Sequence, residues 1–141
     1  MNSELLQKKI LLQRVHNMLK TISGIKVIEI CENIKITDKI QNYYSCEKVP
    51  DLKIACNSEN IYGFIIENMH LVNNMTVYIL FESIPVKVKI MVVSTAVKSL
   101  WNTYHEITII DENMTKVYEI GFDSRDEYNY LFDIFYIKTP E

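Results

Sequence analysis

The sequence predicts an α+β protein with a mostly antiparallel sheet of about five to seven strands and an N-terminal, a central and a C-terminal helix. Two observations predict this class. Apolar residues recur at helical spacing in three separate stretches, and they alternate with polar residues through most of the sequence between them. The strand-like stretches follow one another through short turns without a strand–helix–strand repeat, which favours antiparallel pairing.

The length of 141 residues fits one globular domain, residues 1–141, because two halves of this chain would each be too small for a stable core. Hydrophobic residues make up 48% of the chain and charged residues 23%, which is typical of a globular protein.

The first expected element is a helix that begins near Ser3 and ends before Gly24. Serine is a favoured N-cap, and glycine readily takes the left-handed conformation that follows a helix. The apolar residues of this stretch recur at intervals of three, four and seven: Leu5, Leu11, Leu12, Val15, Met18, Leu19 and Ile22.

Strands are expected next. Alternating isoleucines over residues 28–40 indicate one long strand or two, and a short strand is expected at 52–56 between turn signals. Apolar runs indicate strands at 61–67 and 76–82, and the second should form a hairpin with the alternating residues 86–92.

A second helix is expected to start at the N-cap Ser94 and to run to Tyr104, with Val97 and Leu100 on its apolar face. A second hairpin, residues 106–110 and 116–122, should follow.

The last element is expected to be a helix over 124–137. Ser124 and Glu127 have the spacing of a capping box. Five apolar residues then fall on one helical face: Tyr128, Leu131, Phe132, Phe135 and Tyr136.

No motif for catalysis or cofactor binding is present. Gly24, Gly63 and Gly121 are isolated, so the sequence contains no glycine-rich phosphate-binding loop. The histidines and cysteines lack the spacing of a zinc site; they are His16, His70, His105, Cys31, Cys46 and Cys56. We therefore expect no enzyme activity, no catalytic residue, no metal and no cofactor, and the role of the cysteines stays open.

The chain has no apolar run of the ~20 residues that a membrane span needs and no signal-peptide pattern. Its three cysteines fit a reducing compartment. These features predict a cytoplasmic protein that binds no membrane. The isoelectric point of 5.6 also argues against nucleic acid as a partner, because Lys87 and Lys89 alone form only a minor basic surface.

Charge is unevenly distributed along the chain. Residues 1–105 carry a net charge of +3, whereas residues 106–141 carry −6. An acidic region of this kind favours a basic protein partner. The expected partner-binding residues are Asp111, Glu112, Asp126 and Asp133, which a C-terminal helix and a hairpin tip would leave exposed, followed by Tyr43 and Tyr44.

These features predict a small protein-binding module, an immunity protein or antitoxin that neutralises a toxin domain, for example a nuclease-like one. Two alternatives remain open. The expected order α–β–β–β–α–β–β–α is similar to that of bacterial type III secretion chaperones, which implies a homodimer that wraps an extended segment of another protein. The other alternative is a small enzyme or ligand-binding protein with a pocket between sheet and helices. The sequence does not decide between monomer and homodimer.

Overall fold

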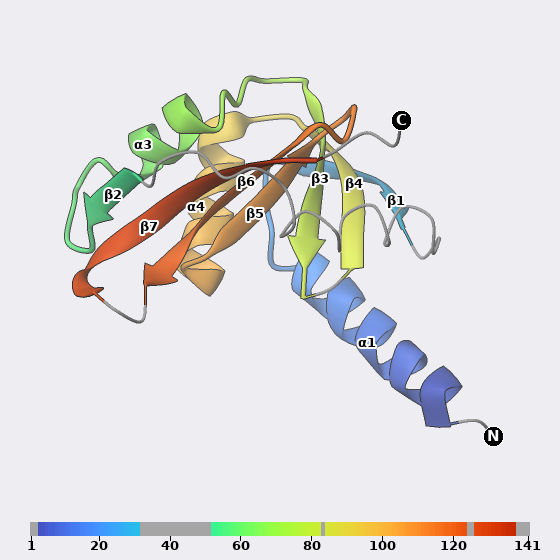
Figure 1. Cartoon of the computed structure of the whole chain (residues 1–141). Coiled ribbons are helices and arrows are strands. Elements are labelled where there is room, and N and C mark those ends of the chain that lie inside the picture. Colours follow the sequence, from blue (N-terminus) through green and yellow to red (C-terminus); the bar gives the residue numbers. More distant parts are fainter. Residues whose placement is uncertain (1–2, 32–51, 83, 124–125, 138–141) are drawn as a thin grey trace.

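In the computed structural model, the described residues 3–31, 52–82, 84–123 and 126–137 form a seven-stranded sheet with helices packed on it (Figure 1). The strand order is β1-β4-β3-β5-β6-β7-β2, and every recorded pairing is antiparallel. The predicted α+β class with an antiparallel sheet is therefore confirmed. The elements in chain order are α1 (Ser3–Leu19), β1 (Ile25–Ile30), β2 (Leu52–Ala55), α3 (Ile61–Asn68), β3 (Thr76–Phe81), β4 (Ile84–Ile90), α4 (Val93–Tyr104), β5 (Ile107–Asp111), β6 (Lys116–Asp123) and β7 (Asp126–Tyr136).

The sheet consists of two parts that diverge at one end. β3 pairs with β5 through three residue pairs, between Val77–Ile79 and Ile109–Asp111. β3 continues to Phe81 and β5 begins at Ile107, and Figure 1 shows these two ends lying apart, the end of β3 at the C-terminal end of α1 and the start of β5 beside α4. A wedge therefore opens between the strands.

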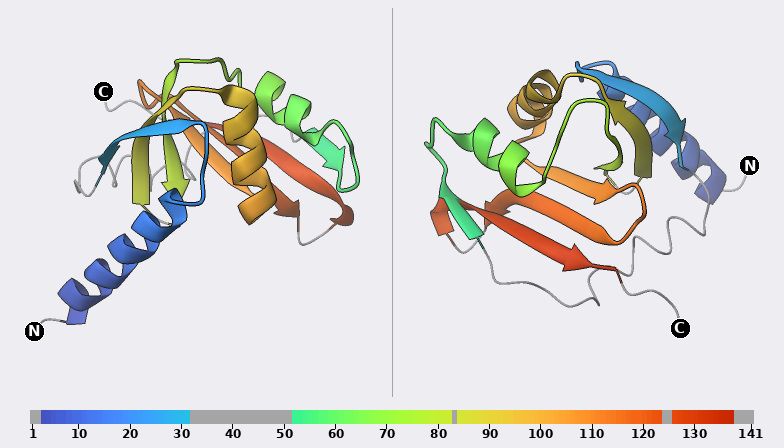
Figure 2. Two further views of the ribbon diagram at one scale, coloured as in Figure 1. Left: turned by 180° about the vertical axis from the view of Figure 1, so that it is seen from behind. Right: turned by 90° about the horizontal axis from the view of Figure 1, so that it is seen from above.

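Helices α3 and α4 cover one face of the sheet and enclose the main core (Figure 2). Alternate residues of the strands point to this face, as the two-residue period of a strand requires. The core includes Ile65, Val77, Ile79, Val86, Val88, Trp101, Ile109, Ile120 and Phe132. A smaller buried cluster lies on the opposite face and contains Cys31, Tyr78, Ile110, Val117 and Phe135.

Within the described residues, helix α1 packs on the rest of the protein through its C-terminal half. Residues 3–10 are all exposed, Val15 is fully buried, and Figure 1 shows the N-terminal half extending away from the sheet. The predicted apolar stripe is thus half-buried or buried from Leu11 onward, while Leu5 stays exposed. None of the helices in the described part of the chain combines the length and apolar character of a membrane span.

Gly24 follows this helix and has a φ of +79°. A Cβ atom there would lie 2.8 Å from both the amide nitrogen of Ala96 and the carbonyl oxygen of Val92. Glycine is therefore required for the conformation, as predicted, and also for the close approach of the chain to the start of α4.

The predicted C-terminal helix is wrong. Residues Asp126–Tyr136 form β7, which pairs with β6 on one side and with β2 on the other. The segment satisfies a strand pattern as well as a helical one, because Tyr130, Phe132 and Ile134 alternate on the side of the main core. Hydrogen bonding to two neighbouring strands, which the local sequence does not reveal, decides the outcome.

The predicted strand at 61–67 is also wrong, because this segment is helix α3. Its buried residues Ile61 and Ile65 are four residues apart, as one helical face requires. A short apolar run does not distinguish a buried helix from a buried strand.

The other described predictions are confirmed: the strand at 52–56, both hairpins and the helix that ends at Tyr104. One detail differs. Helix α4 begins at Val93, and the side-chain oxygen of Asn73, not Ser94, accepts a hydrogen bond from the first amide at 2.9 Å. Of the strand expected over 28–40, β1 includes residues 28–30, and residues 32–40 lie outside the described part.

Candidate protein-binding site

The structure does not bring the acidic residues predicted from the sequence into one surface. Asp111 and Glu112 lie at the turn between β5 and β6, whereas Asp126 begins β7 at the other end of β6. Because a strand advances ~3.3 Å per residue, β6 separates the two groups by roughly 25 Å. Tyr43 and Tyr44 lie outside the described residues, so their predicted role stays a prediction.

Asp111 stabilises its own turn. Its Oδ1 accepts hydrogen bonds from the amides of Thr115 at 2.6 Å and Lys116 at 2.9 Å, and its Oδ2 accepts one from the Thr115 hydroxyl. An aspartate that accepts backbone hydrogen bonds of this kind fixes the geometry of a tight turn. The neighbouring Glu112 is exposed.

The prediction that Asp133 projects outward is wrong. The side chain is only 7% exposed and lies in β7 directly opposite Glu119 of β6. The reason is that alternate side chains of a strand point to the same face of the sheet. Asp133 therefore points to the face opposite α3 and α4, as Leu131 and Phe135 do.

Among the described residues, the most exposed aromatic side chains lie at the end of the β6–β7 hairpin. Phe122 is 66% exposed and Tyr128 is 72% exposed. Neither position emerges from the sequence as a surface residue, since helical spacing places Tyr128 in a core and strand alternation places Phe122 on the inner side with Ile120. Exposed apolar side chains of this size are typical of interaction sites when they lie close together.

Aromatic rings pack against one another next to this end of the hairpin. Tyr130, which pairs with Phe122 across the two strands, meets the ring of Trp101 edge-to-face at a centroid distance of 4.8 Å. Trp101 also contacts the His105 ring at 5.8 Å. Burial and the neighbouring Cys56 raise the pKa of Tyr130, so its phenol stays neutral at physiological pH.

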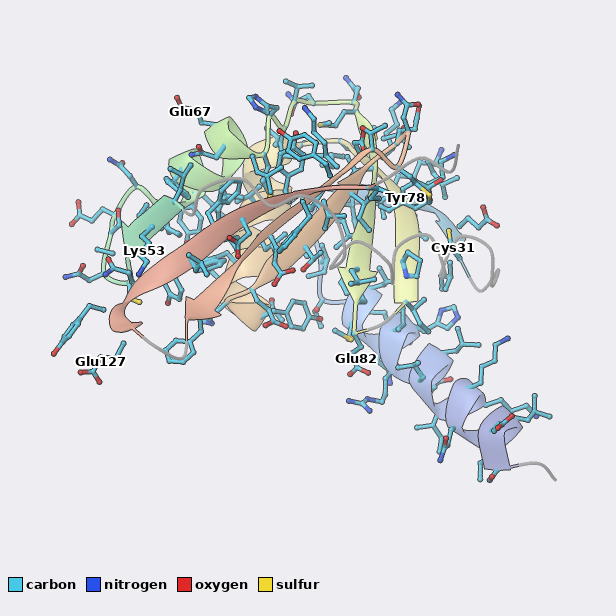
Figure 3. All side chains as sticks on the ribbon, in the orientation of Figure 1. Cys31, Lys53, Glu67, Tyr78, Glu82 and Glu127 are labelled. Atoms are coloured by element: carbon cyan, nitrogen blue, oxygen red, sulfur yellow. The ribbon has the colours of Figure 1, made fainter. Side chains whose placement is uncertain are left out.

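The backbone around Tyr128 is held by β2. The amide of Cys56 donates a hydrogen bond to the Tyr128 carbonyl at 2.9 Å, and Ala55 pairs with Asn129. Glu127 is exposed beside Tyr128, and Figure 3 shows it at the end of the hairpin. We call Phe122, Glu127 and Tyr128 the hairpin surface.

A cleft lies in the wedge between β3 and β5. Its volume is about 510 Å³, within the range of small-molecule pockets. α1 and α4 supply further walls, and Arg14 of α1 forms an ion pair with Glu82 at the rim. A second hollow of about 270 Å³ adjoins the cleft through shared residues and extends to Phe122. The shared residues are Leu80, Glu82, Glu106 and Thr108.

Within the described residues, no three His, Cys, Asp or Glu side chains lie close enough to hold a metal ion. Cys31 is buried, and burial together with Glu29 raises the pKa of its thiol, which therefore stays protonated. Cys46 lies outside the described part of the chain.

Comparison of the chain with protein families, curated proteins and solved structures found no match. The predicted likeness to type III secretion chaperones depended on an element order that ends in a helix. The observed order ends in strand β7, so that likeness loses its basis.

Proposed function

We propose that this chain is a protein-binding module that acts as an immunity protein or antitoxin and neutralises a toxin domain by binding to it directly. The observation that supports this proposal is the exposure of Phe122 and Tyr128 at the end of one hairpin. Aromatic side chains are frequent hot spots, because they bury a large area at a low cost in conformational entropy. Pairing of β7 with both β6 and β2 keeps the hairpin surface ordered before binding.

Charge favours a basic partner. Glu127 adjoins Tyr128, and residues 106–141 carry a net charge of −6. Acidic residues around an apolar contact increase the association rate with a basic protein and contribute less to the affinity itself. A toxin domain that acts on nucleic acid carries a basic surface of this kind, and a bound inhibitor would occlude it.

The test has two steps. The purified chain is used to capture a partner from cells of its source, and the captured protein is then expressed with and without the chain while growth is measured. Binding of that partner is compared for the wild type, for the double variant Phe122→Ser/Tyr128→Ser and for Val72→Ser. Val72 is a matched control, because it is an exposed apolar residue in the loop before β3, remote from the hairpin surface.

We expect the double variant to weaken binding by about 700-fold or more, since each of the two hot spots contributes ~2 kcal/mol or more. Val72→Ser should bind like the wild type. The captured protein should stop growth unless the chain is present. Unchanged binding by the double variant, or a captured protein that is harmless on its own, would refute the proposal.

A further inference from the structure

The cleft between β3 and β5 has an apolar floor. Leu100, Phe81 and Ile107 are buried beneath it, and Met18 and Tyr104 line it as half-buried side chains. The Tyr104 hydroxyl lies 3.5 Å from the Met18 carbonyl oxygen, to which it donates a hydrogen bond, so the two walls from α1 and α4 are joined. An apolar chain entering this cleft would therefore meet a preformed surface.

The rim of the cleft is acidic. Glu106 is exposed and forms no hydrogen bond or ion pair with any residue in the described part of the chain. The other rim carboxylate, Glu82, is paired with Arg14. Glu106 thus offers a negative charge at the edge of a cleft with an apolar floor.

A second hollow connects the cleft with Phe122 of the hairpin surface. The adjoining hollow shares Glu106 and Leu80 with the cleft and is lined at its other end by Phe122 and Leu131. Gly121 permits this connection, because a Cβ atom on it would lie 3.2 Å from the Cβ of Glu106. One partner could therefore contact the cleft and Phe122 through this hollow.

We propose that the cleft holds a lysine or arginine side chain of the same protein partner, with its aliphatic stem on the apolar floor and its cationic end at Glu106. This inference rests on the proposed function. Lysine and arginine fit because each carries a long apolar stem and a charged end. Charge argues against an anionic group at this place, since the carboxylate of Glu106 would repel it.

The test uses short peptides as probes, so it does not depend on identifying the partner. Amide shifts of the isotopically labelled chain are recorded during titration with acetyl-Gly-Lys-Leu-Lys-Gly-amide and with the same peptide carrying glutamine in place of lysine. Both titrations are repeated with Glu106→Gln and with Glu112→Gln. Glu112 is the matched control, because it is an exposed carboxylate at the opposite end of β5.

We expect the lysine peptide to cause saturable shifts around residues 80–82 and 106–108, and the glutamine peptide to bind more weakly. Glu106→Gln should reduce affinity for the lysine peptide about fivefold, the effect of a favourable exposed ion pair, while Glu112→Gln should leave it unchanged. Equal binding of both peptides, or equal loss in both variants, would overturn the inference. Binding of free butylamine as tightly as the lysine peptide would also overturn it, because the cleft would then be a small-amine site.

The two proposals fail separately. If the peptide binds at the cleft but Phe122→Ser/Tyr128→Ser leaves partner binding intact, the proposed function is wrong, while the cleft is still shown to hold a lysine side chain next to Glu106. If the hairpin surface is required for the partner but the lysine peptide does not shift residues 80–82 or 106–108, the cleft assignment is wrong.

Discussion

The strand assignment of residues 126–136 predicts a distinctive order of stabilities for three alanine variants. In β7, Phe132 is 1% exposed and packs edge-to-face against Phe64 at a centroid distance of 5.8 Å. Leu131 points to the other face and is half-buried, and Tyr128 is exposed. A helix would instead place all three on one buried face, where Leu131→Ala alone would cost about 2–5 kcal/mol.

The structure sets the expected magnitudes. Phe132→Ala should cost about 3–5 kcal/mol, because it empties a fully buried aromatic site and removes a ring contact. Leu131→Ala should cost about 1 kcal/mol, roughly half the value of a fully buried leucine. Tyr128→Ala should change the free energy of unfolding by less than about 0.5 kcal/mol, as is usual for an exposed position.

Urea denaturation measures these differences, with fluorescence of the single tryptophan, Trp101, as the signal. Trp101 is buried against Tyr130, so unfolding exposes it to water. A cost for Leu131→Ala equal to that of Phe132→Ala, or a cost above about 2 kcal/mol for Tyr128→Ala, would refute the strand assignment, since only a helix aligns these side chains.

Two further predictions concern the Asp111 turn and the buried Tyr118. Asp111→Ala should lower the free energy of unfolding by about 1–3 kcal/mol, because the amides of Thr115 and Lys116 lose their acceptor. The control Glu112→Gln should leave the free energy of unfolding unchanged. Thermal denaturation measures the stability of both variants. Burial raises the pKa of Tyr118 above its usual 10.0, so the folded state holds this proton more tightly than the unfolded chain does. Stability should therefore be constant at neutral pH and fall as the pH rises above about 10, and Tyr118→Phe should reduce this fall in urea titrations from pH 8 to 11. If the stability of Tyr118→Phe falls equally steeply with pH, the loss of stability at alkaline pH is due to other groups.

Much of the fold follows from local patterns in the sequence. The alternation over residues 86–92 and the turn at Asp111–Asn113 define β4 and the β5–β6 hairpin, because a two-residue period and a tight turn are local properties. The spacing of Val97, Leu100 and Trp101 defines α4 in the same way.

The candidate site could not be predicted in the same way. Tyr128 satisfies the spacing of a buried helical face, and its exposure became apparent only once β7 was placed between β6 and β2. The cleft depends on where β3 and β5 stop pairing, and these strands are separated in sequence by β4 and α4. Glu106 and Gly121 likewise meet only across the sheet.

The sequence by itself determined the class of the protein, its N-terminal and central helices, both hairpins and the acidic character of its last third. Each of these depends on composition or on neighbours within a few residues. Tertiary structure alone decided that residues 61–68 form a helix and that residues 126–136 form a strand, because both segments fit either conformation locally. The deciding free energy came from packing α3 on the sheet and from pairing β7 on both of its edges, which are contacts between segments far apart in the chain.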